Sequence, residues 1–265
     1  MDFNLCGFVG FLNTEERTDI VNDMLDIQSY RGPDDMGIYF DSTSGVHFGH
    51  NRLSIQDLSS QGHQPFISDC GNYIIVFNGE VYNFKLVRTI LEAAGHRFIS
   101  GTDTEVILYA YKEWGSKCLE KLIGMFAFCV LDKTKNKILL VRDRAGVKPL
   151  YYYAYEDEFM FSSELKSFHK HPKFNKKQNS MVLPYYFQFG YIPAPHTIFQ
   201  NCYKLEPGHY LEFNILNGDL NIIKYWDVND FYAQDEIKSD ESEILEDIES
   251  ILNDSVALRM ISDVP

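Results

Sequence analysis

Short apolar runs, rich in aromatic and β-branched residues, occupy the first two thirds of this 265-residue chain. Because Gly, Asn and Asp bound them, these runs predict β-strands. Three other segments, 20–28, 84–91 and 106–111, repeat apolar residues with helical spacing. Strands in groups with helices packed outside them indicate an α+β fold built in layers. The expected strands are 8–12, 37–40, 73–77, 125–131, 138–141, 150–155 and 158–161, with a polar hairpin connection at 132–137.

Charge and hydropathy argue against two classes of partner. The chain has 24 Lys and Arg against 38 Asp and Glu, which gives a net charge of −14. A surface of this sign repels phosphate backbones and anionic lipids, so we expect no nucleic-acid partner. No stretch approaches the roughly 20 apolar residues that span a bilayer, and the acidic start lacks the pattern of a secretory signal. We therefore expect a cytoplasmic protein without a membrane partner.

The five cysteines form an odd set without CxxC spacing. This pattern favours reduced thiols over a disulfide framework or a zinc site. The histidines show no ligand spacing either, so the sequence predicts no metal site. Four of the cysteines are expected to be structural, and Cys6 remains as the candidate for chemistry.

Several motifs have ordinary structural interpretations when each is taken alone. Cys6 at the head of an apolar run is typical of a small buried residue entering a strand. Asn78-Gly79 is as typical of a plain hairpin turn as of a binding site. A capping box at 102–105 places Asp103 at the first helical position, where the helix dipole favours a carboxylate without any ligand. Arg52 fits an exposed surface position equally well.

Together, and in this order, the motifs resemble the class II glutamine amidotransferases, whose domain has the N-terminal-nucleophile fold. The resemblance covers most of residues 6–213 and implies a four-layer αββα sandwich within the α+β class. The matching segments are Cys6-Gly7-Phe8-Val9-Gly10, Arg31-Gly32-Pro33-Asp34-Asp35, Arg52-Leu53-Ser54-Ile55, Gly62-His63-Gln64-Pro65, Phe77-Asn78-Gly79-Glu80-Val81-Tyr82-Asn83, Thr102-Asp103-Thr104-Glu105, Gly124-Met125-Phe126-Ala127-Phe128, Arg142-Asp143-Arg144, Lys148-Pro149-Leu150-Tyr151 and Ser162-Ser163-Glu164-Leu165-Lys166.

This resemblance implies a glutamine site with a role for each residue. Cys6 would be the nucleophile, and its free α-amine, with an ordinary pKa of about 7.7 to 8.0, would be the base. The side-chain amide of Asn78 and the backbone N–H of Gly79 would stabilise the oxyanion. Arg52 would bind the α-carboxylate of glutamine, and Asp103 its α-ammonium group. The residues expected to line the same pocket are Leu53, Ser54, Ile55, Gln56 and Glu80.

The last segment of the chain, 259–265, resembles the start of the synthetase domain in glutamine-dependent asparagine synthetases. The composition becomes acidic near residue 227, and apolar residues then share one helical face from 244 to 258. We therefore expect an exposed apolar helix face here. The expected organisation is an amidotransferase domain at 6–213, a linker at 214–239 and the start of a truncated synthetase domain at 240–265.

The resemblance also implies partners and cofactors. L-glutamine would be the substrate, the protein's own C-terminal synthetase domain would be the partner, and a homodimer is one assembly that it allows. The glutaminase domain would need no cofactor. ATP and Mg²⁺ would act only in the synthetase domain, where they activate aspartate for amidation by ammonia. We expect no ATP binding by residues 1–265 alone.

Five residues, Met1 to Leu5, precede Cys6, whereas members of this family usually read Met-Cys-Gly. An amide nitrogen at Cys6 is not basic, so three interpretations remain. The five residues are removed, the true start lies elsewhere, or the domain is silent as a glutaminase and binds glutamine without cleaving it. Relatives with a similar ending modify sugars or peptides, so the amide acceptor also remains open.

Overall fold

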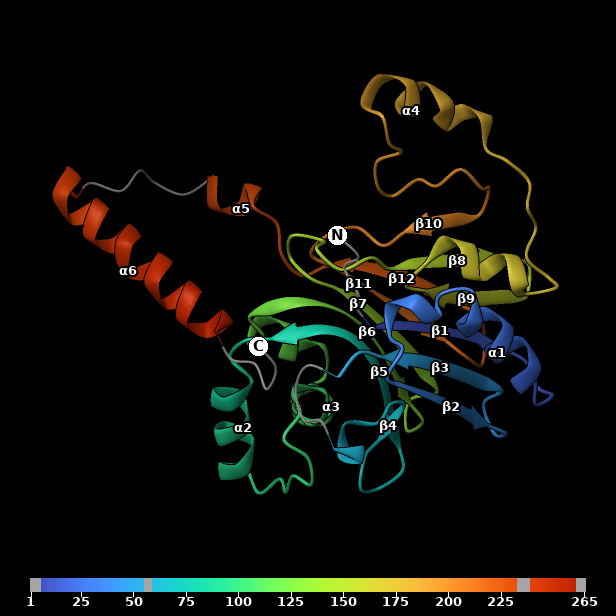
Figure 1. The fold of residues 1–265 in the computed structure, drawn as a ribbon, viewed down its shortest axis with the longest axis horizontal. Helices are drawn as coiled ribbons and strands as arrows, with labels where there is room; N and C mark the ends of the chain where they lie inside the picture. Colours follow the sequence, from blue (N-terminus) through green and yellow to red (C-terminus); the bar gives the residue numbers. More distant parts are fainter. Residues whose placement is uncertain (1–5, 55–58, 233–238, 261–265) are drawn as a thin grey trace.

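Two six-stranded antiparallel sheets form the centre of the molecule (Figure 1). The computed structural model describes residues 6–54, 59–232 and 239–260. The first sheet has the order β10-β8-β9-β1-β3-β2, with β1 Gly7–Leu12, β2 Asp35–Asp41, β3 Val46–Arg52, β8 Tyr151–Tyr155, β9 Glu158–Ser162 and β10 Cys202–Lys204. The second has the order β12-β11-β7-β6-β5-β4, with β4 Phe66–Ile67, β5 Tyr73–Val81, β6 Gly124–Asp132, β7 Lys137–Arg142, β11 His209–Asn214 and β12 Leu220–Lys224.

Three apolar cores show that the layers run helix, sheet, sheet, helix. Between the sheets, Phe48 of the first packs in one cluster with Val76 of the second. Outside the first sheet, α1 (Thr18–Asp26) buries Leu25 in a cluster with Val9. Outside the second, α2 (Phe84–Ala93) and α3 (Asp103–Trp114) bury apolar residues such as Ile107 against the sheet. The expected αββα sandwich is confirmed.

Each strand expected from the sequence overlaps an observed one, and the hairpin at 132–137 joins β6 to β7. The interpretation of Asn78-Gly79 as a plain turn is wrong. Strand β5 continues through this pair, and Asn78 lies opposite Ala127 while Gly79 lies opposite Phe126 of β6. Pairing with a long neighbouring strand overrides the local turn preference.

The second sheet continues into the range 214–239, for which the sequence predicts a linker. Strand β12 pairs with β11, and a short helix, α5 (Asn229–Tyr232), follows. The chain resumes at α6 (Glu241–Arg259), whose N-cap Asp240 accepts a hydrogen bond from the backbone N–H of Glu243 at 3.0 Å. Its assignment to a second domain stays a prediction.

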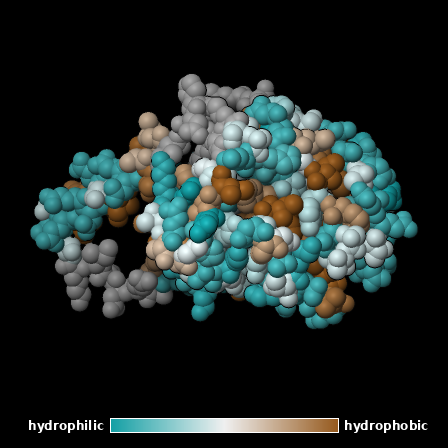
Figure 2. Space-filling model, turned by 90° about the horizontal axis from the view of Figure 1, so that it is seen from below, coloured by the Kyte–Doolittle hydropathy of each residue, from teal (hydrophilic) through white to brown (hydrophobic). Residues whose placement is uncertain are grey.

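Figure 1 shows α4 (Leu183–Phe189), α5 and α6 outside the sandwich. The last residue of α6, Arg259, contacts the sandwich again, because its guanidinium group lies 4.4 Å from the centre of the Tyr82 ring. The expected exposure of the apolar face of α6 is confirmed, since Ile251 is 67% exposed and Leu252 60%. On the face shown in Figure 2, apolar residues reach the surface as separate patches among hydrophilic ones. Within the described ranges, none of the helices combines the length and the apolar character required to cross a bilayer.

Candidate active site

One pocket brings together the start of β1, the end of β3, the middle of β5 and the first turn of α3. Its atom-free space, open solvent at the mouth included, is about 540 Å³. Seven of the predicted site residues line it: Cys6, Arg52, Leu53, Asn78, Gly79, Glu80 and Asp103. Ser54 does not, and its backbone N–H donates to the Asp34 carboxylate at 2.8 Å. Ile55 and Gln56 lie outside the described residues, and the role of each site residue stays a prediction.

The Cys6 thiol lies just before β1 and contacts the residue that follows β3. The backbone N–H of Leu53 donates to the sulfur at 3.3 Å, and the sulfur lies 3.6 Å from the Leu53 carbonyl oxygen. Burial raises the pKa of the Cys6 thiol, although the hydrogen bond from Leu53 and the cations Arg52 and Lys148 act to lower it. The thiol is therefore mostly protonated at neutral pH, so attack on a substrate requires a base.

Asn78 of β5 is 1% exposed, and its side-chain amide has no hydrogen-bond partner among the described residues. Leaving a buried amide unpaired costs about 1 to 3 kcal/mol. Buried polar groups in native proteins are almost always paired, so an exception that lines a pocket indicates a group that a ligand completes. The amide offers both a donor and an acceptor to such a ligand.

Gly79, the next residue, has a backbone conformation with a φ of 152°. A Cβ atom here would lie 2.2 Å from the Met125 carbonyl oxygen and 2.7 Å from the Cα of Phe126. Both neighbours are backbone atoms of β6 and cannot rotate away. Glycine is therefore required for this stretch of β5 to stay paired while it lines the pocket.

Gly79→Ala is expected to lower the free energy of unfolding by about 3 kcal/mol, because it combines backbone strain with overpacking. Urea denaturation followed by circular dichroism measures the loss. Gly71→Ala is the matched control: Gly71 also has positive φ, 69°, but a Cβ atom there meets nothing within 4 Å. We expect that variant to lose only about 1 kcal/mol. Equal losses in the two variants would contradict the steric argument.

Strand β3 ends at Arg52, whose guanidinium group is buried beside segment 59–62. Its Nη1 donates to the Ser59 carbonyl oxygen at 3.1 Å. A Cβ atom at Gly62 would lie 2.0 Å from Arg52 Nη2, so the glycine leaves room for the guanidinium. A guanidinium group is a planar cation, and its paired N–H donors suit the two-point recognition of a carboxylate.

Asp103 begins α3 and is 5% exposed. Its Oδ2 accepts a hydrogen bond from the Val81 backbone N–H at 2.9 Å. Burial, with a smaller contribution from the neighbouring Glu80 charge, raises the pKa of this carboxyl to about 7, although hydrogen bonds from backbone N–H groups act to lower it. A carboxyl held in this way is costly to ionise until a cation arrives, which suits it to bind an ammonium group.

The affinity for a ligand that carries an α-ammonium group is therefore expected to fall as the pH falls. Below pH 7 the ligand-free Asp103 is mainly protonated, and each further unit should raise the Kd about tenfold. Isothermal titration calorimetry with glutamine between pH 5.5 and 8 measures this. Asp103→Asn should bind weakly at every pH, whereas Asp69→Asn, at an exposed carboxylate paired with Lys112, should behave like the unmodified protein. A flat wild-type profile would contradict the prediction.

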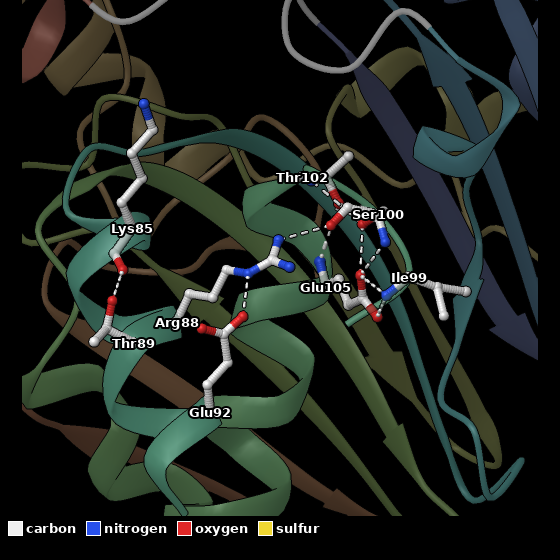
Figure 3. A network of polar contacts seen from close by, with 8 residues as sticks. All are labelled: Lys85, Arg88, Thr89, Glu92, Ile99, Ser100, Thr102 and Glu105. Atoms are coloured by element: carbon white, nitrogen blue, oxygen red, sulfur yellow. Dashed lines mark hydrogen bonds and ion pairs between the residues drawn. The ribbon is translucent and has the colours of Figure 1, made fainter. Parts of the chain in front are cut away.

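A network of hydrogen bonds fixes the loop that leads into Asp103 (Figure 3). The Glu105 carboxylate accepts from the Ser100 backbone N–H and hydroxyl, both at 2.7 Å, and from the Ile99 N–H at 3.0 Å. Arg88 of α2 donates to the Ser100 carbonyl oxygen at 2.8 Å. Thr102 caps α3 through the Glu105 N–H at 3.3 Å, as expected, but the Glu105 side chain bonds to the loop at residues 99 and 100.

Arg31 and Glu164 belong to matched segments, but the sequence suggests no role for them. In the structure, Arg31 Nε donates to the Cys6 carbonyl oxygen at 3.0 Å, and Arg31 Nη1 pairs with Glu164 at 2.8 Å. Tyr30 also donates to Glu164. The Arg31–Glu164 pair therefore fixes the backbone of Cys6, the candidate nucleophile. Only the recurrence of arginine and carboxylate in matched segments hints at this contact.

Lys148 and Gln64 line the pocket as well, and sequence reasoning assigns neither of them to it. Gln64 Oε1 accepts a hydrogen bond from the backbone N–H of Phe77 at 2.7 Å, which holds β5 just before Asn78. Lys148 is 2% exposed although it carries an ammonium group. The described part of the chain contains no cluster of three or more His, Cys, Asp or Glu side chains that suits a metal ion.

Solved structures define the class of fold. The glutamine phosphoribosylpyrophosphate amidotransferase from B. subtilis superposes with a TM-score of 0.61 at 19% sequence identity, over 83% of this chain and 49% of its own. At this identity the similarity concerns the fold alone. The two-sheet architecture around Cys6 is thus that of the N-terminal-nucleophile amidotransferases.

Sequence comparisons place the chain within that class. Residues 5–226 match the family model described as a glutamine amidotransferase domain, and the chain belongs to this family. A Bacillus subtilis relative named asparagine synthetase [glutamine-hydrolyzing] 2 is 36% identical over 98% of this chain and 36% of its own length. A Gibberella zeae relative named amidase chry2 is 35% identical over 91% of this chain and 35% of its own length. A Methanocaldococcus jannaschii relative is 37% identical over 98% of this chain and 53% of its own length. The chain therefore spans about half the length of these relatives or less.

Proposed function

We propose that this chain is the glutaminase part of a glutamine-hydrolysing asparagine synthetase, which cleaves L-glutamine to L-glutamate and ammonia. One observation carries the proposal: a single pocket holds a thiol, an unpartnered buried amide, an arginine and a buried carboxyl. These are the groups required to attack an amide and to hold the two charged ends of an amino acid. The family match and the names of the relatives agree with it.

In the proposed reaction Arg52 binds the α-carboxylate of glutamine and Asp103 its α-ammonium group, which points the side chain toward Cys6. A free α-amine on Cys6 takes the thiol proton, and the sulfur bonds to the amide carbon. Asn78 and the N–H of Gly79 stabilise the oxyanion. The C–N bond then breaks, ammonia leaves with the returned proton, and water hydrolyses the thioester to glutamate.

The acceptor of the ammonia is tested in the protein that carries both the glutaminase and the synthetase parts. That protein is incubated with glutamine labelled with ¹⁵N at the side-chain amide, together with aspartate, ATP and Mg²⁺. We expect ¹⁵N-labelled asparagine, detected by mass spectrometry. Labelled ammonia without labelled asparagine would indicate a glutaminase that serves another acceptor. Omission of ATP is the control, which should stop the transfer of ¹⁵N to aspartate without stopping glutamate release.

A silent glutamine-binding domain is the second candidate, because five residues precede Cys6 and would block its amine. Glutamine binding by calorimetry without glutamate release would select it. An amidotransferase that uses another acceptor, a sugar or a peptide, is the third candidate. One relative is named as an amidase and not as an asparagine synthetase, which agrees with an acceptor other than aspartate. We further propose a cytoplasmic protein that binds neither nucleic acid nor membranes, requires no cofactor for glutamine hydrolysis and is able to form a homodimer.

A further inference from the structure

Lys148 is a buried cation in the pocket that the steps above do not use. It is 2% exposed and lines the pocket together with Cys6 and Glu80. Within the described part of the chain, its ammonium group makes no hydrogen bond and no ion pair, and only charges at longer range act on it. Lysine is almost never fully buried without a partner, because an unpaired buried charge is costly. The position therefore indicates an interaction with charge that develops in the pocket.

The loop that carries Lys148 is held firmly in place. Asp143 accepts hydrogen bonds from the backbone N–H groups of Ala145, Val147 and Lys148, the last at 3.0 Å. Arg142 donates to the Lys148 carbonyl oxygen at 2.9 Å and to the Gly146 carbonyl oxygen at 2.8 Å. A loop fixed at both edges holds the lysine stem in the pocket at no further cost in backbone entropy.

The charges around Lys148 come from several elements. Glu80 of β5 and Cys6, just before β1, attract its ammonium group, Asp143 attracts it from its own loop, and Arg31 repels it. Burial lowers the pKa of Lys148 and raises that of Glu80. Near the sulfur, Arg52 is the other cation and Asp103 the opposing anion. In the proposed complex with glutamine, Arg52 and Asp103 are engaged by the substrate, which leaves Lys148 as the cation available to the sulfur.

We propose that Lys148 is a positioning residue whose ammonium group stabilises the thiolate of Cys6 and pairs electrostatically with Glu80 across the pocket. The proposal deepens the glutaminase assignment, on which its importance for catalysis rests. Its test does not depend on that assignment, because thiolate formation is measured without glutamine.

The test is the pH dependence of Cys6 alkylation by iodoacetamide in the 265-residue chain. The thiolate sulfur displaces iodide and forms an S–C bond, so the rate follows the thiolate fraction. Because the exposed Cys70 thiol reacts with iodoacetamide as well, the modified Cys6 peptide is quantified by mass spectrometry. Lys148→Met should move the inflection upward by about one pH unit, with alkylation at pH 7 slower by about threefold because the more basic thiolate is also more nucleophilic.

Two control variants distinguish an effect of the Lys148 charge on the sulfur from an effect of side-chain packing and from an effect of the protein's net charge. Lys148→Arg keeps the cation and should keep the inflection close to that of the unmodified protein. Lys173→Met removes an exposed lysine that pairs with Glu158 away from the pocket and should change nothing. If Lys148→Met does not fold, Lys148→Gln provides the same measurement.

Three outcomes would overturn the proposal. An unchanged inflection in a folded neutral variant would show that Lys148 does not act on the sulfur. A weaker affinity for glutamine with an unchanged inflection would make Lys148 a substrate ligand instead. Failure of both neutral variants to fold would assign the ammonium group to the stability of the fold. None of these outcomes bears on glutamate release, so the glutaminase proposal is judged separately.

Discussion

In the form of the chain that begins at residue 6, Cys6→Ala is expected to abolish glutamine hydrolysis while the protein stays folded and still binds glutamine. Loss of a nucleophile lowers the rate by about 10⁴-fold or more, because no other group in the site forms the covalent intermediate. The substitution removes only the sulfur, which accepts one hydrogen bond from Leu53. Arg52 and Asp103 remain in place to bind the two ends of the substrate. Glutamate release measures activity, and calorimetry with glutamine measures binding.

Cys70→Ala is the matched control for that experiment. Cys70 is an exposed free cysteine in the turn before β5 and does not line the pocket. Its replacement should leave glutamate release unchanged. Hydrolysis by Cys6→Ala within tenfold of the unmodified protein would mean that the thiol is not the nucleophile. Loss of glutamine binding in this variant would instead show that the sulfur shapes the ligand site.

The sequence predicts seven of the strands and misses β3, β4, β10, β11 and β12. Of the missed strands, β3 carries Arg52 into the candidate site. This strand reads Val46-His47-Phe48-Gly49-His50-Asn51-Arg52 and is buried along its whole length. Its polar residues each have a partner that is distant in sequence. His50 Nε2 lies 2.9 Å from the Phe77 carbonyl oxygen, and Asn51 Nδ2 donates to the Leu25 carbonyl oxygen at 2.9 Å. The periodicity of apolar residues carries no information about such pairs, so β3 is identified only from the structure.

The candidate site is also predicted only in part, because some of its residues act through contacts that the sequence does not reveal. The resemblance to the amidotransferase family predicts that Cys6, Arg52, Asn78 and Asp103 share one pocket, and the structure brings them together. Burial of Lys148 could not be predicted, because lysine is ordinarily a surface residue. The contact from Arg31 to the Cys6 carbonyl depends on the short 3₁₀ helix Ser29–Arg31, which places the Arg31 side chain beside Gly7 of β1. Residues that act through backbone contacts or burial leave little trace in a single sequence.

Exposure of the Cys6 amine is expected to raise glutamine hydrolysis by about 10² to 10⁴-fold, the usual contribution of a general base. Two forms of the chain decide it: one that begins at Cys6, obtained by specific proteolysis, and one that keeps Met1 to Leu5. An amine with an ordinary pKa near 8 is partly neutral at pH 7, whereas the amide of the longer form accepts no proton. Glutamate release measures activity, and intact mass identifies each form.

The comparison also separates the two main functional candidates. Because burial raises the pKa of the Cys6 thiol, the longer form lacks both a base and a substantial thiolate fraction at neutral pH. It should therefore bind glutamine and release almost no glutamate, as the silent candidate requires. Acetylation of the amine in the shorter form should return it to this state. Equal activity in the two forms would exclude the amine as the base. Another group in the pocket would then take the thiol proton, and Glu80 is the best candidate because burial raises its pKa.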